Sequence, residues 1–343
     1  MALAYPFPHP PPPGTTLEVA HGVHWLRMPL PFALDHINLW LIDEGEGFTL
    51  VDTGYGDEAT RAIWDAHRDG LLRQRPMRRL VATHYHPDHL GNAAWLGRRY
   101  DLQVEITAPE YLTGHAIHAQ TSGYALDDTC ELFRAHGVSD EHVDELRGRG
   151  NRYRAGVPEM PKRFTRLFPG SRLAIGGSGW QVIAGYGHSP EHAALHCEER
   201  GVMVSGDMLL PRISTNVAVW PAEPDGDPLA RFLASIGTFE PLPADTLVLP
   251  SHGLPFRGIA HRVTQLRDHH RDRLRELDDA VRAAGGGCTA ADLVPVLFRR
   301  PLDLQQRFFA VGEAIAHLNH LGSQGALARR VGDDGVIRFV AAS

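Results

Sequence analysis

The sequence predicts an α/β fold in which the candidate functional side chains lie in the turns that follow the strands. Short apolar runs bounded by glycine, such as Ile37–Ile42 and Phe48–Val51, are typical of buried strands. Segments typical of helices, such as Asp57–Asp69 and Pro228–Phe239, alternate with these runs. Metal-binding side chains recur directly after the predicted strands. Ligand sites of open α/β sheets lie at such strand ends.

Residues 1–16 are predicted to form a proline-rich arm. Six prolines between Tyr5 and Gly14 favour an extended, polyproline-like backbone without internal hydrogen bonds. We interpret the arm as a loosely held leader. The alternative is that it packs on a second subunit, which would favour a homodimer. Strand-like sequence begins at Leu17, and the main domain is predicted to span residues 17–266.

The central motif is H-x-H-x-D-H, formed by His84, His86, Asp88 and His89 after the predicted strand Leu80–Ala82. A helix is predicted to follow over residues 90–99. Three imidazoles and a carboxylate within six residues would crowd a single metal ion, so two metal ions are the simpler geometry. These ligands suit zinc, and also iron or manganese. The alternative is a surface loop in a chain with 21 histidines.

Three more candidate ligands lie in glycine-containing turns that follow other predicted strands. They are His188, Asp207 and His252. Glycine lets the backbone bend so that the neighbouring side chain points out of the sheet edge. Asp52 ends another strand in the sequence V-D-T-G, where it could orient a metal-binding histidine from behind or simply cap the turn.

A mostly polar, helix-rich insertion is predicted over residues of about 110–169. An insertion of this size beside a metal site could form a lid or one wall of the substrate pocket. Its histidines lack metal-ligand spacing and are assigned to solvated helix faces; they are His115, His118, His136 and His142.

Residues 267–343 are predicted to form a small C-terminal domain. A long helix over Ile259–Ala284 leads into it, and a helix capped by Thr289, a helix over Leu304–Leu321 and a hairpin over residues 331–340 follow. From residue 289 onward, six arginines face five acidic residues. This balance differs from the basic stripe of a nucleic-acid-binding surface, so we expect the domain to pack on the main domain or a second subunit.

The composition indicates which partners and which cellular compartment to expect. The 343 residues include 41 acidic and 34 basic side chains, and the net charge is −7. This balance gives no reason to expect nucleic acid or an anionic membrane as a partner. Three scattered cysteines, with no secretory signal and no apolar stretch of about 20 residues, favour a soluble, cytoplasmic protein without disulfide bonds.

Taken together, the motifs resemble those of the metallo-β-lactamase-fold hydrolase superfamily over roughly Leu17 to Leu266. They are V-D-T-G at 51–54, H-Y-H-P-D-H at 84–89, G-H-S-P-E-H at 187–192, S-G-D at 205–207 and S-H-G at 251–253. The resemblance implies an αββα sandwich of two mixed sheets flanked by helices. The C-terminal region resembles the small winged-helix domain that ends a subset of these hydrolases.

The resemblance also implies how two divalent metal ions would be shared among the ligands. One ion would be held by His84, His86 and His188, and the other by Asp88, His89 and His252, with Asp207 bridging both. A hydroxide between the ions would be the nucleophile, because bound metals lower the pKa of water from about 15.7 to near 7. Asp88 could align this hydroxide or pass a proton to the leaving group. His192 fits either a supporting or transition-state-stabilising role or simple packing.

The expected activity is hydrolysis of a small acyl thioester or ester, because the metal site resembles that of hydroxyacylglutathione hydrolase. That enzyme's glutathione-binding helical domain is not recognisable here, so coenzyme A thioesters fit equally well. The alternatives are a phosphodiesterase or ribonuclease, a lactonase, and a metal-holding scaffold without catalysis. Asp207 stands where enzymes that open β-lactam rings usually carry cysteine or serine, which argues against that reaction.

Overall fold

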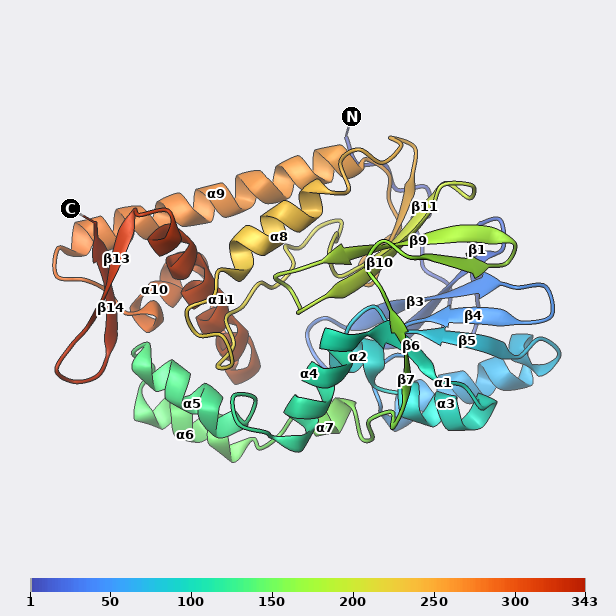
Figure 1. The fold of residues 1–343 in the computed structure, drawn as a ribbon, viewed down its shortest axis with the longest axis horizontal. Coiled ribbons are helices and arrows are strands. Elements are labelled where there is room, and N and C mark those ends of the chain that lie inside the picture. The colour runs from blue at the N-terminus through green and yellow to red at the C-terminus, as the bar shows by residue number, and fades with distance from the viewer. Residues whose placement is uncertain (1, 343) are drawn as a thin grey trace.

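A computed structural model describes residues 2–342 and shows two β-sheets packed face to face, with helices on both outer sides (Figure 1). The first sheet has seven strands in chain order: β1 (Leu17–Ala20), β2 (Val23–Pro29), β3 (His36–Asp43), β4 (Phe48–Val51), β5 (Met77–Val81), β6 (Val104–Thr107) and β7 (Phe164–Leu167). Strands β1 to β4 are antiparallel, and β4 to β7 are parallel. The sheet is therefore mixed, as expected.

The second sheet has five strands in the order β12-β11-β10-β9-β8. Their bounds are β8 (Arg172–Ile175), β9 (Ser178–Gly185), β10 (His192–Cys197), β11 (Val202–Gly206) and β12 (Leu247–Pro250). Only β11 and β12 pair in parallel. Strands β10 and β11 are buried along their whole length, which explains why their sequences are apolar runs rather than alternating patterns.

Three apolar cores hold these layers together. Trp25, Trp40 and Trp180 fill the core between the two sheets. Helices α1 (Glu58–Asp69) and α3 (Ala93–Tyr100) cover the outer face of the first sheet, and a short 3-10 turn over Leu71–Arg73 follows α1. Helices α8 (Pro228–Gly237) and α9 (Ile259–Ala284) cover the second sheet. This arrangement is the predicted four-layer αββα sandwich.

The helix predicted over residues 90–99 is interrupted. It forms as α2 (Pro87–Leu90) and α3, with Gly91 and Asn92 between them. The Asn92 side-chain amide donates hydrogen bonds to the backbone carbonyls of Thr53, Gly54 and Tyr55, at 3.3, 3.2 and 2.7 Å. This amide satisfies a buried turn that follows β4 and holds it against the metal-binding motif.

The middle of the chain contains four helices and one strand. The helices are α4 (Ala108–Ala119), α5 (Leu126–Ala135), α6 (Asp140–Gly148) and α7 (Tyr153–Gly156). Strand β7 lies inside the segment predicted to be a helical insertion, and it pairs with β6 as the outer strand of the first sheet. The polar sequence of this exposed edge strand gave no alternating apolar signal.

The C-terminal region consists of α10 (Ala290–Leu297), α11 (Leu304–Ser323), β13 (Leu327–Val331) and β14 (Ile337–Ala341). Thr289 caps α10 as predicted, because its hydroxyl accepts a hydrogen bond from the backbone N–H of Asp292 at 3.1 Å. The predicted order of helix, helix and hairpin is present. Its assignment as a winged helix stays a prediction.

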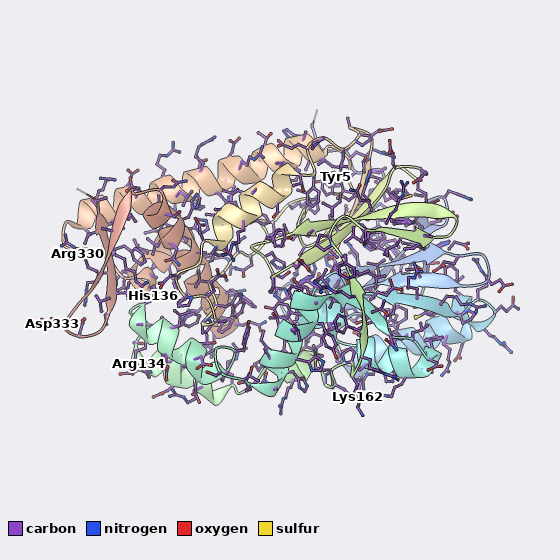
Figure 2. The ribbon with its side chains drawn as sticks, in the orientation of Figure 1. Tyr5, Arg134, His136, Lys162, Arg330 and Asp333 are labelled. Atoms are coloured by element: carbon purple, nitrogen blue, oxygen red, sulfur yellow. The ribbon has the colours of Figure 1, made fainter. Side chains whose placement is uncertain are left out.

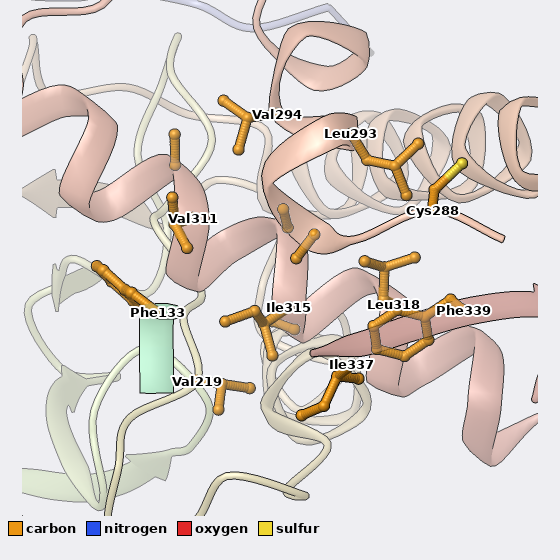
Figure 3. Close-up of a cluster of buried hydrophobic side chains, with 14 of the residues drawn as sticks. Phe133, Val219, Cys288, Leu293, Val294, Val311, Ile315, Leu318, Ile337 and Phe339 are labelled. Atoms are coloured by element: carbon orange, nitrogen blue, oxygen red, sulfur yellow. The ribbon is translucent and has the colours of Figure 1, made fainter. Parts of the chain in front are cut away.

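Helices α5 and α6 share one apolar core with this C-terminal region rather than with the sandwich. Phe133 of α5 lies in that core with Val311 and Ile315 of α11, and its ring meets Phe308 with centroids 5.5 Å apart (Figure 3). Helix α9 connects the core to the sandwich along one side of the molecule (Figure 1).

The assignment of all four mid-chain histidines to solvated faces is wrong for His136. This side chain, labelled in Figure 2, is 1 % exposed. Its ring stacks on Phe339 of β14, with ring centroids 6.0 Å apart. His115 and His118 are half-buried. Their local sequence is polar, and the burying partner of His136 lies about 200 residues away, where no local pattern reveals it.

The proline-rich arm packs against its own chain. The backbone of Ala4 pairs with that of Arg257, with N···O distances of 3.3 and 2.9 Å, and Tyr5 joins the core beneath α8 and α9. Among residues 2–342, all three cysteines are buried and unbridged. None of the helices in this range combines the length and apolar composition needed to cross a bilayer.

Candidate metal centre

The structure brings all seven candidate ligands to one edge of the sandwich. Each lies in a turn that directly follows a strand, or in the short helix α2 after β5. They form two groups: His84, His86, His188 and Asp207, and Asp88, His89 and His252. In each group the potential ligand atoms lie within 4.8 Å of one another.

The first group has the spacing of a metal coordination sphere. Nε2 of His84 lies 2.9 Å from Nδ1 of His86 and 3.3 Å from Nε2 of His188. Nε2 of His188 lies 3.4 Å from Oδ2 of Asp207. Ligands at 2.0–2.1 Å around a tetrahedral zinc ion would be about 3.3 Å apart. The spacing of the first group therefore fits one ion.

The second group shares Asp207 with the first. Nε2 of His252 lies 3.4 Å from Oδ2 of Asp88 and 3.4 Å from Oδ1 of Asp207. Nε2 of His89 lies 3.6 Å from the same Asp207 oxygen. Thus Oδ2 of Asp207 faces the first group and Oδ1 faces the second, which is the geometry of a bridging carboxylate.

Hydrogen bonds behind three histidines fix which ring nitrogen faces the centre. The Nδ1 atoms of His188 and His252 lie 2.7 and 2.8 Å from the backbone carbonyls of Asn216 and His36. Nδ1 of His89 lies 2.8 Å from Oδ2 of Asp52. Because these partners are acceptors, each Nδ1 carries hydrogen, so Nε2 of each ring is the nitrogen that faces the centre.

The ligand atoms of both groups need cations between them. Lone pairs of several imidazoles and carboxylates point at one another across 3–4 Å, and they repel unless a positive charge lies between them. Within residues 2–342, Nε2 of His89 and Oδ1 of Asp207 are buried without a hydrogen-bond partner, which costs about 1–3 kcal/mol per group. The residues therefore fit two divalent metal ions, and both zinc and iron accept such ligands.

The ionisation of the ligands agrees with this fit. Burial lowers the pKa of His84 and of His86 well below the usual value, so both are neutral. Burial opposes ionisation of Asp207, but the facing His252 and His89 rings hold its pKa well below the usual range. Burial likewise lowers the pKa of His89, yet the carboxylates of Asp52, Asp88 and Asp207 outweigh burial and raise it. Metal binding must then displace a proton from His89.

Asp52 lies directly behind His89. Besides His89, its carboxylate accepts hydrogen bonds from the backbone N–H and the hydroxyl of Thr83, at 2.7 and 2.9 Å. Its backbone is left-handed, with φ of 63°, which turns the side chain back under the motif. Asp52 thus connects the end of β4 with the start of the histidine motif.

His192 lies behind the ligands and belongs to neither group. Its Nε2 accepts a hydrogen bond from the backbone N–H of Asp207 at 3.2 Å, and its ring lies 4.9 Å from that of His84. Gly206 passes over this ring with φ of 53°, and a Cβ there would lie 2.2 Å from Nε2. The S-G-D sequence therefore needs glycine so that Asp207 can approach the centre.

Glu110 is a site residue that the sequence analysis missed. It lies in the first turn of α4 and is fully buried. Its carboxylate accepts hydrogen bonds from the backbone N–H of Tyr85, the hydroxyl of Ser189 and the backbone N–H of Glu191, at 3.0, 2.7 and 2.6 Å. It thereby joins the turn that carries His84 and His86 to the turn that carries His188. A carboxylate just after β6, at the same sheet edge, was the available signal.

Comparisons with known proteins agree with the fold and the site. Residues 33–252 match the family described as "Metallo-beta-lactamase superfamily", and residues 274–342 match "Metallo-beta-lactamase-like, C-terminal domain". A solved beta-lactamase domain protein from Burkholderia ambifaria is 48% identical, covers 99% of this chain and 98% of its own, and has a TM-score of 0.91. "Probable metallo-hydrolase YqjP" of Bacillus subtilis is 25% identical over 88% of this chain and 92% of its own length.

Two more distant relatives have names that state a reaction. A bovine acyl-coenzyme A thioesterase, MBLAC2, is 26% identical over 56% of this chain and 65% of its own length. A linear primary-alkylsulfatase from a Pseudomonas species is 24% identical over 74% of this chain and 48% of its own length. The family match covers more than half of the chain and includes both groups of ligands. The chain therefore belongs to the metallo-beta-lactamase superfamily, as a metallo-hydrolase with a dinuclear H-x-H-x-D-H site.

Proposed function

We propose that this protein hydrolyses a small acyl thioester or ester, with coenzyme A thioesters as the first class to test. The observation that carries the proposal is the split geometry of Asp207, whose two oxygens face the two ligand groups. A bridging aspartate resembles the thioesterase, lactonase and phosphodiesterase branches of the superfamily and argues against opening of a β-lactam ring. The similarity to the bovine thioesterase supports the same class.

Two divalent cations, when bound, would supply a water-derived nucleophile at neutral pH and polarise the carbonyl oxygen of the substrate. The protein's own contribution is to hold the ligands rigidly and to leave one side open. Among the carboxylates at the centre, Asp88 and Asp207 are 13 % and 11 % exposed at the side chain, whereas Asp52 is 1 % exposed. Asp88 is thus on the accessible side, where we propose that it takes a proton from the attacking water and hands it to the leaving thiol or alcohol.

The mid-chain helices would form one wall of the pocket. Tyr153 of α7 donates a hydrogen bond from its hydroxyl to the carbonyl of Tyr85 at 2.7 Å, inside the histidine motif. Gly56, in the turn after β4, donates its backbone N–H to the carbonyl of Gly156 at 2.8 Å. Helix α7 is therefore attached to the turns around Asp88, and we propose that it limits the size of the acyl group.

The test is the initial rate of the metal-loaded protein on a panel of substrates. The panel contains acyl-coenzyme A, acyl-glutathione, a lactone, a phosphodiester and an alkyl sulfate. His84→Ala is the loss-of-site variant, and His9→Ala, which changes an exposed histidine in the arm, is its matched control. We expect thioester turnover that His84→Ala loses and His9→Ala keeps. Turnover of only the phosphodiester, or of only the alkyl sulfate, would overturn the proposal.

A further inference from the structure

Helix α11, in the C-terminal region, reaches a metal-binding histidine through one intermediate residue. Nδ1 of His188 donates a hydrogen bond to the backbone carbonyl of Asn216 at 2.7 Å. The side-chain amide of Asn216 donates in turn to Oε2 of Glu313 at 2.9 Å. Glu313 lies in α11 and is only 9 % exposed. A hydrogen-bonded chain therefore runs from the metal centre into the C-terminal region.

A second connection joins the same helix to Asp207. The hydroxyl of Thr215 donates a hydrogen bond to the backbone carbonyl of Asp207 at 2.5 Å. A few residues later, the backbone N–H of Val219 donates to the carbonyl of Gly312 in α11 at 3.1 Å. The segment of residues 215–219, called the bridging segment here, thus contacts two metal ligands on one side and α11 on the other.

The bridging segment lies so close to α11 that a side chain at residue 312 would have to push it away. A Cβ added at Gly312 would lie 3.0 Å from Cβ of Ala218 and 3.4 Å from the carbonyl oxygen of Val219. On the next part of the helix surface, Val219 packs in the same apolar core as Val311 and Ile315 (Figure 3). Packing and hydrogen bonds therefore fix the segment in one position relative to α11.

We propose that α11 is a structural part of the metal centre, in which Glu313 and Asn216 are positioning residues that hold His188, and Gly312 sets the approach of the bridging segment. A histidine ligand coordinates well only if its ring orientation is fixed from behind, and loss of such a partner costs about 10- to 100-fold in metal affinity. Here the partner is a backbone carbonyl, so its position depends on what holds the segment. This inference concerns metal binding and not the acyl substrate. If the protein does not hydrolyse acyl thioesters or esters, the inference about α11 is unaffected, and the reverse also holds.

The test measures metal affinity by competition with a chromogenic chelator, on full-length protein reconstituted with zinc. We expect Glu313→Ala and Asn216→Ala each to weaken binding of one of the two ions by about tenfold, the lower end of the range for such supports. Glu313→Gln should retain nearly full affinity, because its amide oxygen can still accept from Asn216. The double variant Asn216→Ala with Glu313→Ala should be no worse than either single variant, since both remove one link.

Two glycines of α11 provide a matched pair. Valine has a higher helix propensity than glycine, so the replacement raises helix propensity by a similar amount at either position. A Cβ at Gly322 would meet nothing closer than the Leu327 carbonyl oxygen at 3.9 Å, whereas one at Gly312 would press on the bridging segment. We expect Gly312→Val to weaken metal binding and Gly322→Val to leave it unchanged, whatever each does to the melting temperature.

Equal metal affinity in wild type, Glu313→Ala and Asn216→Ala would overturn the inference, and a lower melting temperature in those variants would then mean that α11 only packs. Loss of affinity in Glu313→Gln as large as in Glu313→Ala would also overturn it, because the hydrogen bond would not be the link. Asn216 is half-buried in a loop, so Asn216→Ala keeps the test decisive if a change at Glu313 prevents folding.

Discussion

The core between the two sheets and the contact between the C-terminal region and the sandwich are held together by different forces. The first is filled by large apolar side chains, among them Trp25, Trp40 and Trp180. The second contains buried polar groups: Glu313 with Asn216, and His270 with His317, whose ring nitrogens lie 3.1 Å apart. Apolar packing gives stability that hardly depends on pH, whereas buried ionisable groups make the contact sensitive to pH and to single polar changes.

The largest expected effect on stability is in the apolar core. Trp40→Ala should lower the free energy of unfolding by about 3–5 kcal/mol, because it removes a fully buried side chain and leaves a cavity. Urea unfolding at pH 6 and pH 8 measures this, and the loss should be the same at both values. A loss below about 1 kcal/mol would mean that the two sheets are held chiefly by something else.

The next largest effect is expected at Glu110, which joins two ligand-bearing turns by polar contacts alone. Glu110→Ala should lower metal affinity by about 10- to 100-fold, because it leaves the Tyr85 and Glu191 N–H groups without their acceptor. Chelator competition measures this, with Glu105→Ala as a control because Glu105 lies on the neighbouring strand and pairs with Arg79. Unchanged affinity in Glu110→Ala would show that the turns hold their positions independently.

A smaller effect is the pH dependence of the polar contact. Burial, followed by the nearby His317, lowers the pKa of His270 from 6.5 to about 2. Below pH 6.5, His270 therefore binds a proton in the unfolded chain but not in the folded chain. The contribution of neutral, buried His270 to the free energy of unfolding is complete above pH 6.5 and is lost as the pH falls below that value. The loss is up to about 1.4 kcal/mol per pH unit.

His270→Leu should make the curve of unfolding free energy between pH 6.5 and pH 5 less steep than in wild type, even if it is less stable at pH 7.5. Trp40→Ala is the contrasting variant and should shift the curve without changing its slope. Parallel curves for His270→Leu and wild type would show that His270 accepts a proton in the folded state.

The smallest effect is expected where α5 and α6 meet solvent. Arg147 pairs with Asp127 and Asp144 at 2.9 and 3.1 Å, and all three side chains are largely exposed. Arg147→Ala should therefore leave the free energy of unfolding nearly unchanged. Phe133→Ala, in the core beneath, is the comparison and should cost several times more.

The metal ligands could be predicted from the sequence because their signal is local. Each follows an apolar run, and His188, Asp207 and His252 also stand beside glycine in a short turn. Because the strands end at the same sheet edge, these turns lie together. The αββα sandwich could be predicted from the same apolar runs together with the resemblance to the metallo-β-lactamase-fold superfamily. Asp52, which supports His89, gave the same strand-end signal, but the support of His188 gave none. Asn216 lies 97 residues from its partner Glu313, and its contact with His188 uses a backbone carbonyl, which no residue type reveals.

Where local prediction failed, a distant partner decided the structure. Asn92 interrupts the expected helix because its amide binds the turn after β4, and His136 is buried because Phe339 covers it. Glu110 looked like an ordinary first-turn carboxylate of a helix. In each case the sequence shows the residue type, and only the packing of separate segments shows its role.

The apolar core shared by α5, α6 and α11 has a consequence for synthesis of the chain. About 160 residues separate the end of α6 at Gly148 from the start of α11 at Leu304. At 5–20 residues per second, the ribosome needs roughly 10–30 s to supply the partner helix after α6 is complete. During that interval Phe133 and Val143 lack the partner surface that covers them in the finished fold. The nascent chain therefore exposes apolar surface, which chaperones or neighbouring chains on a polysome can bind.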